Sequence, residues 1–132
     1  MNEFVIKSSD SDLKLILSDI KGDYFKVSLV SNHLSAFREV WAYTDAYGFA
    51  DLLEYISSLQ KPWEDTVSWG SIEGDFKISI TCNILGKVKF QIELSATGED
   101  EDWFIKTYLN TELGQLESLA KAARKFFGSS PE

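Results

Sequence analysis

Hydrophobic and polar residues alternate along much of the chain, and this alternation predicts β-strands. Apolar side chains alternate with others over residues 13–17 and again over 25–29. A period of two directs successive side chains to opposite faces of a strand. The intervening segment Asp19-Ile20-Lys21-Gly22 begins with an Asx residue and ends with glycine, which favours a three-residue hairpin loop over 20–22. This loop predicts that Leu17 lies opposite Phe25 and that Gly22 has a positive φ.

The same signals predict a second hairpin. Apolar residues alternate over 76–82 and over 88–94, and Asn83-Ile84-Leu85-Gly86 lies between them. A loop over 84–86 places Cys82 opposite Val88 and Ile80 opposite Phe90, with Gly86 at positive φ. The polar residues of this hairpin are expected to face solvent: Asp75, Lys77, Ser79, Thr81, Lys87, Lys89, Gln91 and Glu93.

A third strand is expected after each hairpin, over about 33–43 and about 103–109. Shorter strands are expected near 4–7 and 67–69. In both third strands apolar or aromatic residues occur at both parities, so either both faces are covered or one presents aromatic side chains. One parity of these strands carries the aromatic residues Trp41, Tyr43, Phe104 and Tyr108. The other parity carries Leu34, Ala36, Val40, Ala42, Trp103, Ile105 and Leu109.

Two helices are predicted by apolar residues that recur every three or four positions, over about 45–60 and about 111–127. Thr44 or Asp45 can cap the first helix, and Asn110 or Thr111 the second. The order hairpin, strand, helix therefore occurs twice. It predicts an α+β fold with a mostly antiparallel sheet of about six to eight strands and two helices on one face. The length favours a single domain over 1–132, with a frayed tail at 129–132.

Charge and composition narrow the classes of partner. With 21 acidic and 13 basic residues, the chain has a formal charge of -8, which repels nucleic acid and anionic membranes and favours a basic partner. No apolar stretch approaches the ~20 residues that cross a bilayer, and the first residues do not resemble a secretory signal. We therefore expect a cytoplasmic protein that binds neither nucleic acid nor membrane.

Residues that could support catalysis are few. His33 is the single histidine and Cys82 the single cysteine, so an internal disulfide is impossible and a zinc site would lack its usual ligands. Cys82 is expected to face the core, where a thiol is inert. The sequence also lacks a P-loop and a nucleophile elbow. We expect no enzyme activity, no metal and no cofactor.

The candidate contacts for a partner are acidic and aromatic. Four consecutive carboxylates precede a tryptophan in the segment Glu99, Asp100, Glu101, Asp102 and Trp103. Mutual repulsion of these carboxylates predicts an exposed hairpin loop, which is either solvated surface or a contact for a basic protein. A smaller candidate patch consists of Trp63, Glu64 and Asp65.

Several segments resemble a family of small bacterial proteins known only as a domain of unknown function. They are Trp69-Gly70-Ser71-Ile72-Glu73-Gly74, the alternating strand after it, Gly86-Lys87-Val88, Trp103 and the last helix. The resemblance covers about residues 35–127. Other members often carry a histidine in the turn before the glycine, where this chain has Asn83-Ile84-Leu85, so no role based on that histidine carries over. In size, acidity and α+β build the chain also resembles immunity proteins of bacterial toxin systems.

These observations favour a non-enzymatic binding protein of the immunity type that neutralises a basic toxin domain. The alternative is a small-ligand-binding or regulatory domain with a pocket between sheet and helices. A secretion chaperone agrees with the size and acidity, but such chaperones usually begin with a helix, whereas this chain begins with a predicted strand. The oligomeric state does not follow from the sequence.

Overall fold

The computed structural model describes residues 3–42 and 47–128, which form two four-stranded antiparallel sheets and two α-helices. The predicted α+β class and the number of strands are confirmed. The strands divide between two sheets of four, where a single sheet was expected. Sheet A has the order β1 (Phe4–Lys7), β2 (Lys14–Lys21), β3 (Tyr24–Val30), β4 (Ser35–Trp41). Sheet B has the order β5 (Val67–Gly70), β6 (Phe76–Cys82), β7 (Lys87–Ala96), β8 (Trp103–Glu112).

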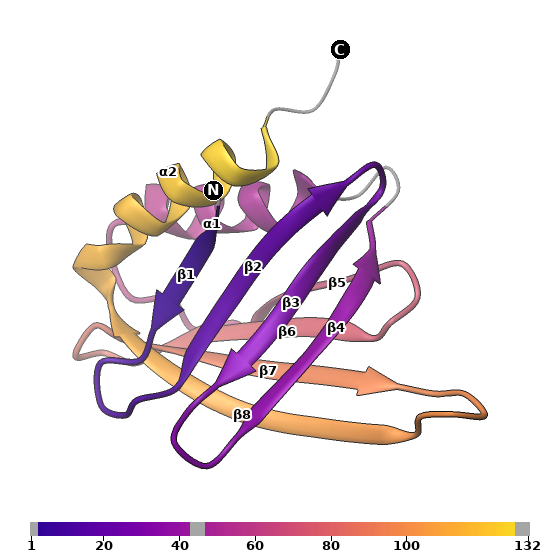
Figure 1. Ribbon diagram of the computed structural model, residues 1–132. Helices are drawn as coiled ribbons and strands as arrows, with labels where there is room; N and C mark the ends of the chain where they lie inside the picture. Colours follow the sequence, from indigo (N-terminus) through magenta and orange to yellow (C-terminus); the bar gives the residue numbers. More distant parts are fainter. Residues whose placement is uncertain (1–2, 43–46, 129–132) are drawn as a thin grey trace.

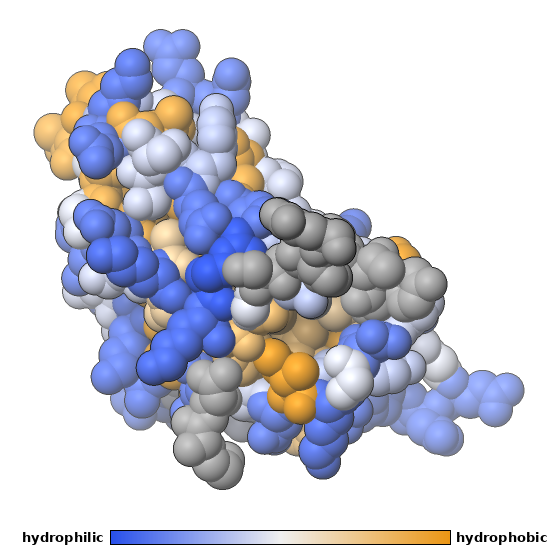
Figure 2. Space-filling view, turned by 90° about the horizontal axis from the view of Figure 1, so that it is seen from above, coloured by the Kyte–Doolittle hydropathy of each residue, from blue (hydrophilic) through white to orange (hydrophobic). Residues whose placement is uncertain are grey.

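The sheets pack face to face with their strands crossing steeply, and both helices cover one end of the pair (Figure 1). α1 (Tyr47–Leu59) joins the sheets in sequence, and α2 (Leu116–Phe127) follows the short 3-10 helix η2 (Leu113–Gln115). Seen from the helix side, hydrophilic residues cover most of the surface (Figure 2). Within the described ranges, no helix is long and apolar enough to span a membrane.

Alternating side chains from both sheets meet in one buried cluster, to which α1 and α2 contribute. Aromatic rings connect its parts: Phe49 of α1 lies edge to face with Phe4 of β1 at 5.7 Å between ring centroids. Phe49 also lies 5.8 Å from the ring of Trp69 in β5, which in turn lies 5.7 Å from Phe76. Edge-to-face contacts of this kind stabilise a core beyond the area that they bury.

The second hairpin has the predicted register. Cys82 pairs with Val88 and Ile80 with Phe90, and Gly86 has φ 84°. The side-chain carboxamide oxygen of Asn83 accepts hydrogen bonds from the backbone N–H groups of Leu85 and Lys87, both at 3.0 Å. This Asx residue therefore satisfies the donors of the loop, as its position predicts.

The register predicted for the first hairpin is wrong, although Gly22 has the expected positive φ of 59°. β2 continues to Lys21, which pairs with Tyr24, and Leu17 lies opposite Val27 instead of Phe25. The cause is a register shift between Ser18 and Lys21, where Asp19 adopts φ 53°. Aspartate tolerates this left-handed conformation, and a bulge inserts one extra residue into one strand.

The second helix begins later than predicted. β8 continues through Glu112, which pairs with Lys87, so Asn110 and Thr111 belong to the strand ladder and do not cap the helix. The 3-10 helix η2 then precedes α2. α2 ends at Gly128, which has φ 79° and donates its N–H to the carbonyl of Arg124. Tyr43, the predicted caps Thr44 and Asp45, and the predicted tail at 129–132 lie outside the described residues.

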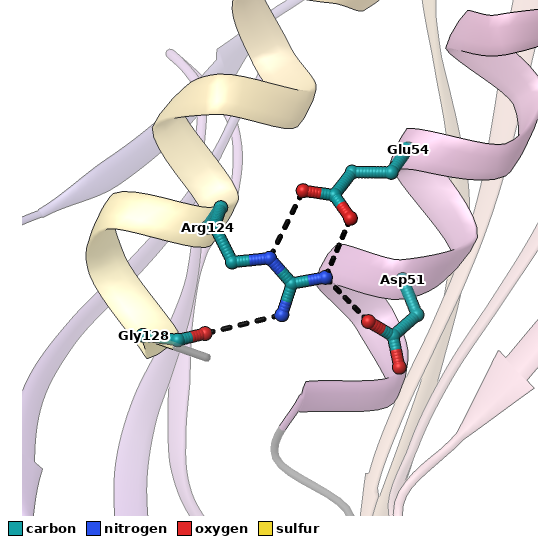
Figure 3. Close-up of polar contacts among 4 residues, drawn as sticks. All are labelled: Asp51, Glu54, Arg124 and Gly128. Atoms are coloured by element: carbon teal, nitrogen blue, oxygen red, sulfur yellow. Dashed lines mark hydrogen bonds and ion pairs between the residues drawn. The ribbon is translucent and has the colours of Figure 1, made fainter. Parts of the chain in front are cut away.

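Arg124 connects the two helices (Figure 3). Its Nε and Nη2 donate to the two carboxylate oxygens of Glu54 at 2.9 and 2.7 Å, and Nη2 also contacts Asp51. Its Nη1 donates to the carbonyl of Gly128 at 3.1 Å, so all three guanidinium nitrogens have partners. Hydrogen bonds to Glu54 and then to Asp51 raise the pKa of Arg124, and the bond from Arg124 lowers the pKa of Glu54.

Candidate binding groove

An open groove of about 580 Å³ runs along the edge strand β4. One wall is β4 and the residue before it, over residues 34–39, and the other wall is Glu101, Trp103 and Ile105 at the start of β8. The tip of the β7–β8 hairpin projects beyond β4 (Figure 1), so sheet A does not cover this end of sheet B. Trp103 and Ile105 are accordingly half-buried, although they share the inward parity of buried Leu109.

β4 presents unpaired backbone groups to this groove. The even-numbered residues direct their backbone groups toward β3. The carbonyl of Leu34 accepts a hydrogen bond from Ser31 N–H, and the N–H of Ala42 donates to the carbonyl of Asp23. Backbone direction alternates in an antiparallel pair, and the register is continuous from Ser35 to Trp41. The outward groups therefore belong to Ser35, Phe37 and Glu39, here called the free edge of β4. Within the described part of the chain these residues have no backbone partner on that side.

The far end of β8 is closed by the loop between β1 and β2. Ser9 donates its N–H to the carbonyl of Asn110 at 2.7 Å, and Asn110 donates its N–H to Ser8 Oγ at 3.1 Å. Asn110 Nδ2 also donates to Asp10 at 2.7 Å. The hydrogen bond from Ser8 lowers the pKa of Asp10, and those from Asn110 and the charge of Lys87 act in the same direction. The outer edge of β8 thus has partners at Asn110.

An ion pair fixes one residue of the groove wall, Arg38, to the turn between β5 and β6. Arg38 Nε of β4 donates to Asp75 Oδ2 at 2.8 Å, and Ser71 Oγ donates to Asp75 Oδ1 at 2.6 Å. Asp75 is only 7% exposed, which corrects its predicted place on the solvent side of the hairpin. Asp75 precedes β6 in the turn from β5, so the alternation of the strand does not determine its direction.

Arg38 uses only part of its donor capacity in this pair. Its side chain is 29% exposed and lines the groove, and Nε is its one nitrogen with a partner in the described part of the chain. A guanidinium that is oriented through Nε can donate from its Nη groups to a carbonyl or carboxylate. The arrangement therefore offers fixed donors beside the apolar wall of Trp103 and Ile105.

Carboxylates surround the same groove. Glu39 and Glu101 line it, and Glu99, Asp100 and Asp102 flank Glu101 in an exposed connection between β7 and β8. The prediction of an exposed hairpin loop is confirmed for this run. Arg38 is paired with Asp75, and Lys26 of β3 lies across from Glu39 and over the ring of Phe37. The four carboxylates at 99–102 outnumber these cations, so the net charge around the groove is negative.

The second predicted patch lies at the other end of sheet B. The backbone of Trp63 lies beside Cys82, which pairs with Val88, whereas the groove begins near Leu94 and Ile105. At ~3.4 Å per residue, Val88 and Leu94 are about 20 Å apart along β7. Glu64 and Asp65 are exposed, and Trp63 is half-buried against the core, with no hydrogen-bond partner for its indole nitrogen among the described residues. The structure does not bring the two predicted patches together.

Neither the histidine nor the cysteine lies in the groove wall. His33 is exposed in the turn before β4, and its N–H donates to Ser31 Oγ at 3.2 Å. Cys82 is buried, and this burial raises the pKa of its thiol. Within 3–42 and 47–128, no cluster of three or more histidine, cysteine, aspartate or glutamate side chains could hold a metal ion.

The aromatic residues left open by the sequence divide between the faces. Phe37 and Phe104 are 63% and 61% exposed on the outer sides of their sheets, while Trp103 faces inward. Lysines partly cover two of the outer rings: Lys26 lies 4.5 Å from the Phe37 centroid, and Lys89 lies 5.0 Å from that of Tyr108. The outer faces therefore present aromatic side chains with cations above them.

Sequence reasoning missed Arg38 and Asp75. The available signal was the segment from Trp69 to Gly74, since Ser71 and Gly74 form the turn that positions Asp75. Ser71 N–H donates to the Phe76 carbonyl at 2.8 Å, Gly74 N–H donates to the Ser71 carbonyl at 2.9 Å, and Gly74 has φ 76°. Arg38 gave no comparable signal, because its partner comes from a different sheet.

A smaller hollow of about 330 Å³ lies between β1 and α2, lined by residues that include Val5, Thr111 and Leu119. It has the position expected for a pocket between sheet and helix, but no charged network like that of Arg38 lies in its wall. Its only charged lining residue is Lys7, which has no ion-pair partner in the described part of the chain.

Comparison with known proteins gives a family. A search of curated proteins found no match. A family model described as "Family of unknown function (DUF6228)" matches residues 6–130, which is nearly the whole chain. This agrees with the resemblance to a family that is known only as a domain of unknown function. The chain belongs to the family of unknown function DUF6228.

Proposed function

We propose that this chain is a non-enzymatic binding protein whose groove at β4 receives a basic segment of a partner protein. The observation that supports it most directly is the joint position of Glu101 and Trp103 in the groove wall, next to three further carboxylates. Complementary charge accelerates association, while affinity rests on a few apolar or aromatic anchors. The groove combines both elements.

The biological class that we propose is an immunity-type protein that neutralises a basic toxin domain. Two facts support this class: the formal charge of -8, and an acidic groove that one protein partner could fill. A toxin domain with a basic surface would be attracted over long range by the same charges.

The first experiment uses peptides as probes. A peptide of about seven residues that alternates lysine with valine is titrated into the ¹⁵N-labelled protein and followed by NMR, with a glutamate–valine peptide as control. We expect the lysine peptide to change the chemical shifts of residues 34–39 and 101–105, and the glutamate peptide to leave them unchanged. Shifts spread over other surfaces, or no shifts at any salt concentration, would overturn the proposal.

The matched variant neutralises the acidic run by replacing Glu99, Glu101, Asp100 and Asp102 with the corresponding amides. Since exposed charges act through a screened field, the wild type should lose affinity for the lysine peptide steeply with salt and the variant only weakly. Equal salt dependence of the two proteins would show that the run is solvated surface.

The second candidate function is binding of a small ligand with a carboxylate and an aromatic or apolar body. The groove volume of about 580 Å³ lies within the range of small-molecule sites, and Arg38 offers oriented donors beside Trp103. A titration with benzoate tests it: shifts confined to Arg38 and Trp103 would favour this candidate over the peptide.

A further inference from the structure

We infer that the partner segment binds as a fifth strand of sheet A, paired with the free edge of β4. This inference rests on the proposed function and specifies how the same groove recognises its occupant. Strand addition uses main-chain hydrogen bonds for affinity and alternating side-chain contacts for specificity.

The residues that line the groove indicate that the added strand pairs with β4 and not with β8. From β4 and the residue before it, the consecutive positions 34–39 line the groove, as expected for a space that runs along a strand edge. From β8, only the inward-facing Trp103 and Ile105 line it. The occupant therefore lies beside β4 and across the inner face of β8.

Sheet B is incompletely covered where an added strand would lie. Leu94 of β7 is buried, but its neighbour Ile105 of β8 is only half-buried, as is Trp103. β4 is the last strand of sheet A, and nothing in the described part of the chain continues the sheet over these two side chains. An extended segment of about six residues, or about 20 Å, would match the length of the free edge and cover them.

Charge determines the class of segment. Glu39 and Glu101 line the groove and Arg38 is already paired with Asp75, so a second acidic edge would be repelled. A second copy of this chain would bring the same carboxylates and its own charge of -8. The fitting occupant is a basic protein segment whose alternate side chains are apolar and face Trp103, while its basic side chains lie near Glu39.

Backbone methylation of the lysine–valine peptide tests the pairing. Residues of an added strand alternate between amides that point to β4 and amides that point away. Methylating every lysine amide or every valine amide therefore blocks pairing in one peptide and leaves it intact in the other. We expect at least a tenfold difference in Kd between the two peptides, with the blocked set revealing antiparallel or parallel addition.

The outcomes separate this inference from the proposed function. If the unmethylated peptide binds the groove but the two methylated peptides bind equally, strand addition is wrong and the binding function stands. If the unmethylated peptide does not bind, the proposed function itself fails.

A protein variant gives an independent test. Phe37→Pro removes an outward N–H of the free edge, and proline is tolerated on an edge strand when its missing N–H faces solvent. Phe37→Ala is the matched control, since it removes the ring but keeps the donor. We expect Phe37→Pro to raise the peptide Kd about tenfold over the alanine variant, which corresponds to one lost hydrogen bond. Equal Kd values in the two folded variants would overturn the inference.

Sedimentation or light scattering of the free protein tests the competing occupant. We expect a monomer at concentrations where the peptide binds. A dimer that is lost in Phe37→Pro but kept in Phe37→Ala would show that the edge pairs with a second copy, and would overturn the inference.

Discussion

Two arginines join separate parts of this molecule, and they differ in how many of their donors the protein satisfies. Arg124 connects α1 and α2 with all three guanidinium nitrogens bonded, to Glu54, Asp51 and Gly128. Arg38 of β4 bonds through Nε to Asp75 in the turn between β5 and β6, is bonded through no other nitrogen among the described residues, and borders an open groove. A saturated arginine is explained by stability. The Nη groups of Arg38 remain available to solvent or to the ligand that we propose.

Removing Asp75, the buried partner of Arg38, should have the largest effect on the free energy of unfolding. Asp75→Ala removes the partner of Arg38 Nε and of Ser71 Oγ in a site where the carboxylate is nearly inaccessible. Breaking a buried pair leaves its other members unsatisfied, so we expect the free energy of unfolding to fall by about 3 kcal/mol in urea denaturation. A loss below about 1 kcal/mol would mean that solvent replaces the carboxylate easily.

Arg124→Met should have a smaller effect on stability and none on the groove. Its bonds to Glu54 and Asp51 lie on carboxylates that are 48% and 63% exposed, so solvent screens them. We expect a loss of about 1–2 kcal/mol for the whole set of bonds. The lysine–valine peptide should bind this variant like the wild type. A change in peptide affinity would show that the two regions are coupled.

Lowering the pH should reduce the difference in the free energy of unfolding between wild type and Arg124→Met. The folded-state pKa of Glu54 is lowered by its hydrogen bond to Arg124. A lowered carboxylate pKa gives stability that is present above the unfolded-state pKa and is lost as pH falls through the folded-state pKa. Unfolding curves at neutral pH and at successively lower pH should therefore converge below the ordinary range of a glutamate. A constant difference would exclude Glu54 as the main partner.

The smallest expected effect is that of neutralising residues 99–102. All four carboxylates are exposed, and none forms an ion pair or a side-chain hydrogen bond with another described residue. We expect the free energy of unfolding to change by less than about 0.5 kcal/mol, or to rise slightly as mutual repulsion is relieved. Thermal unfolding of the amide variant beside wild type measures this, and a loss above 1 kcal/mol would make the run a structural element.

The predictability of this fold differs between its two hairpins. Asn83 and Gly86 both act locally, so the register of the second hairpin followed from sequence spacing. In the first, the bulge at Asp19 depends on a left-handed residue that alternation does not reveal. The bulge changed the partner of Leu17 from the predicted Phe25 to Val27. These two residues lie two positions apart and therefore share one face of β3, so the prediction that Leu17 and Phe25 are buried still holds.

The candidate site was only partly accessible from sequence. The exposed run at Glu99–Asp102 followed from like-charge repulsion. Alternation showed that Trp103 shares a face with Leu109, but it left open whether that face or the opposite one is covered, and the structure shows that Trp103 faces inward. The groove itself depends on where sheet A ends relative to sheet B, and hydrophobic alternation does not assign strands to sheets. For the same reason the contact between Arg38 and Asp75, which are separated by 37 positions, could not be predicted.

The strictly sequential strand order has a consequence for folding kinetics. Every strand pairs only with its neighbour along the chain, so each meander can form through local hairpins before the halves meet. Docking of the two meanders should then be a late event, and the bond between Arg38 and Asp75 should be absent from the transition state. Removing it should accelerate unfolding and leave the refolding rate nearly unchanged.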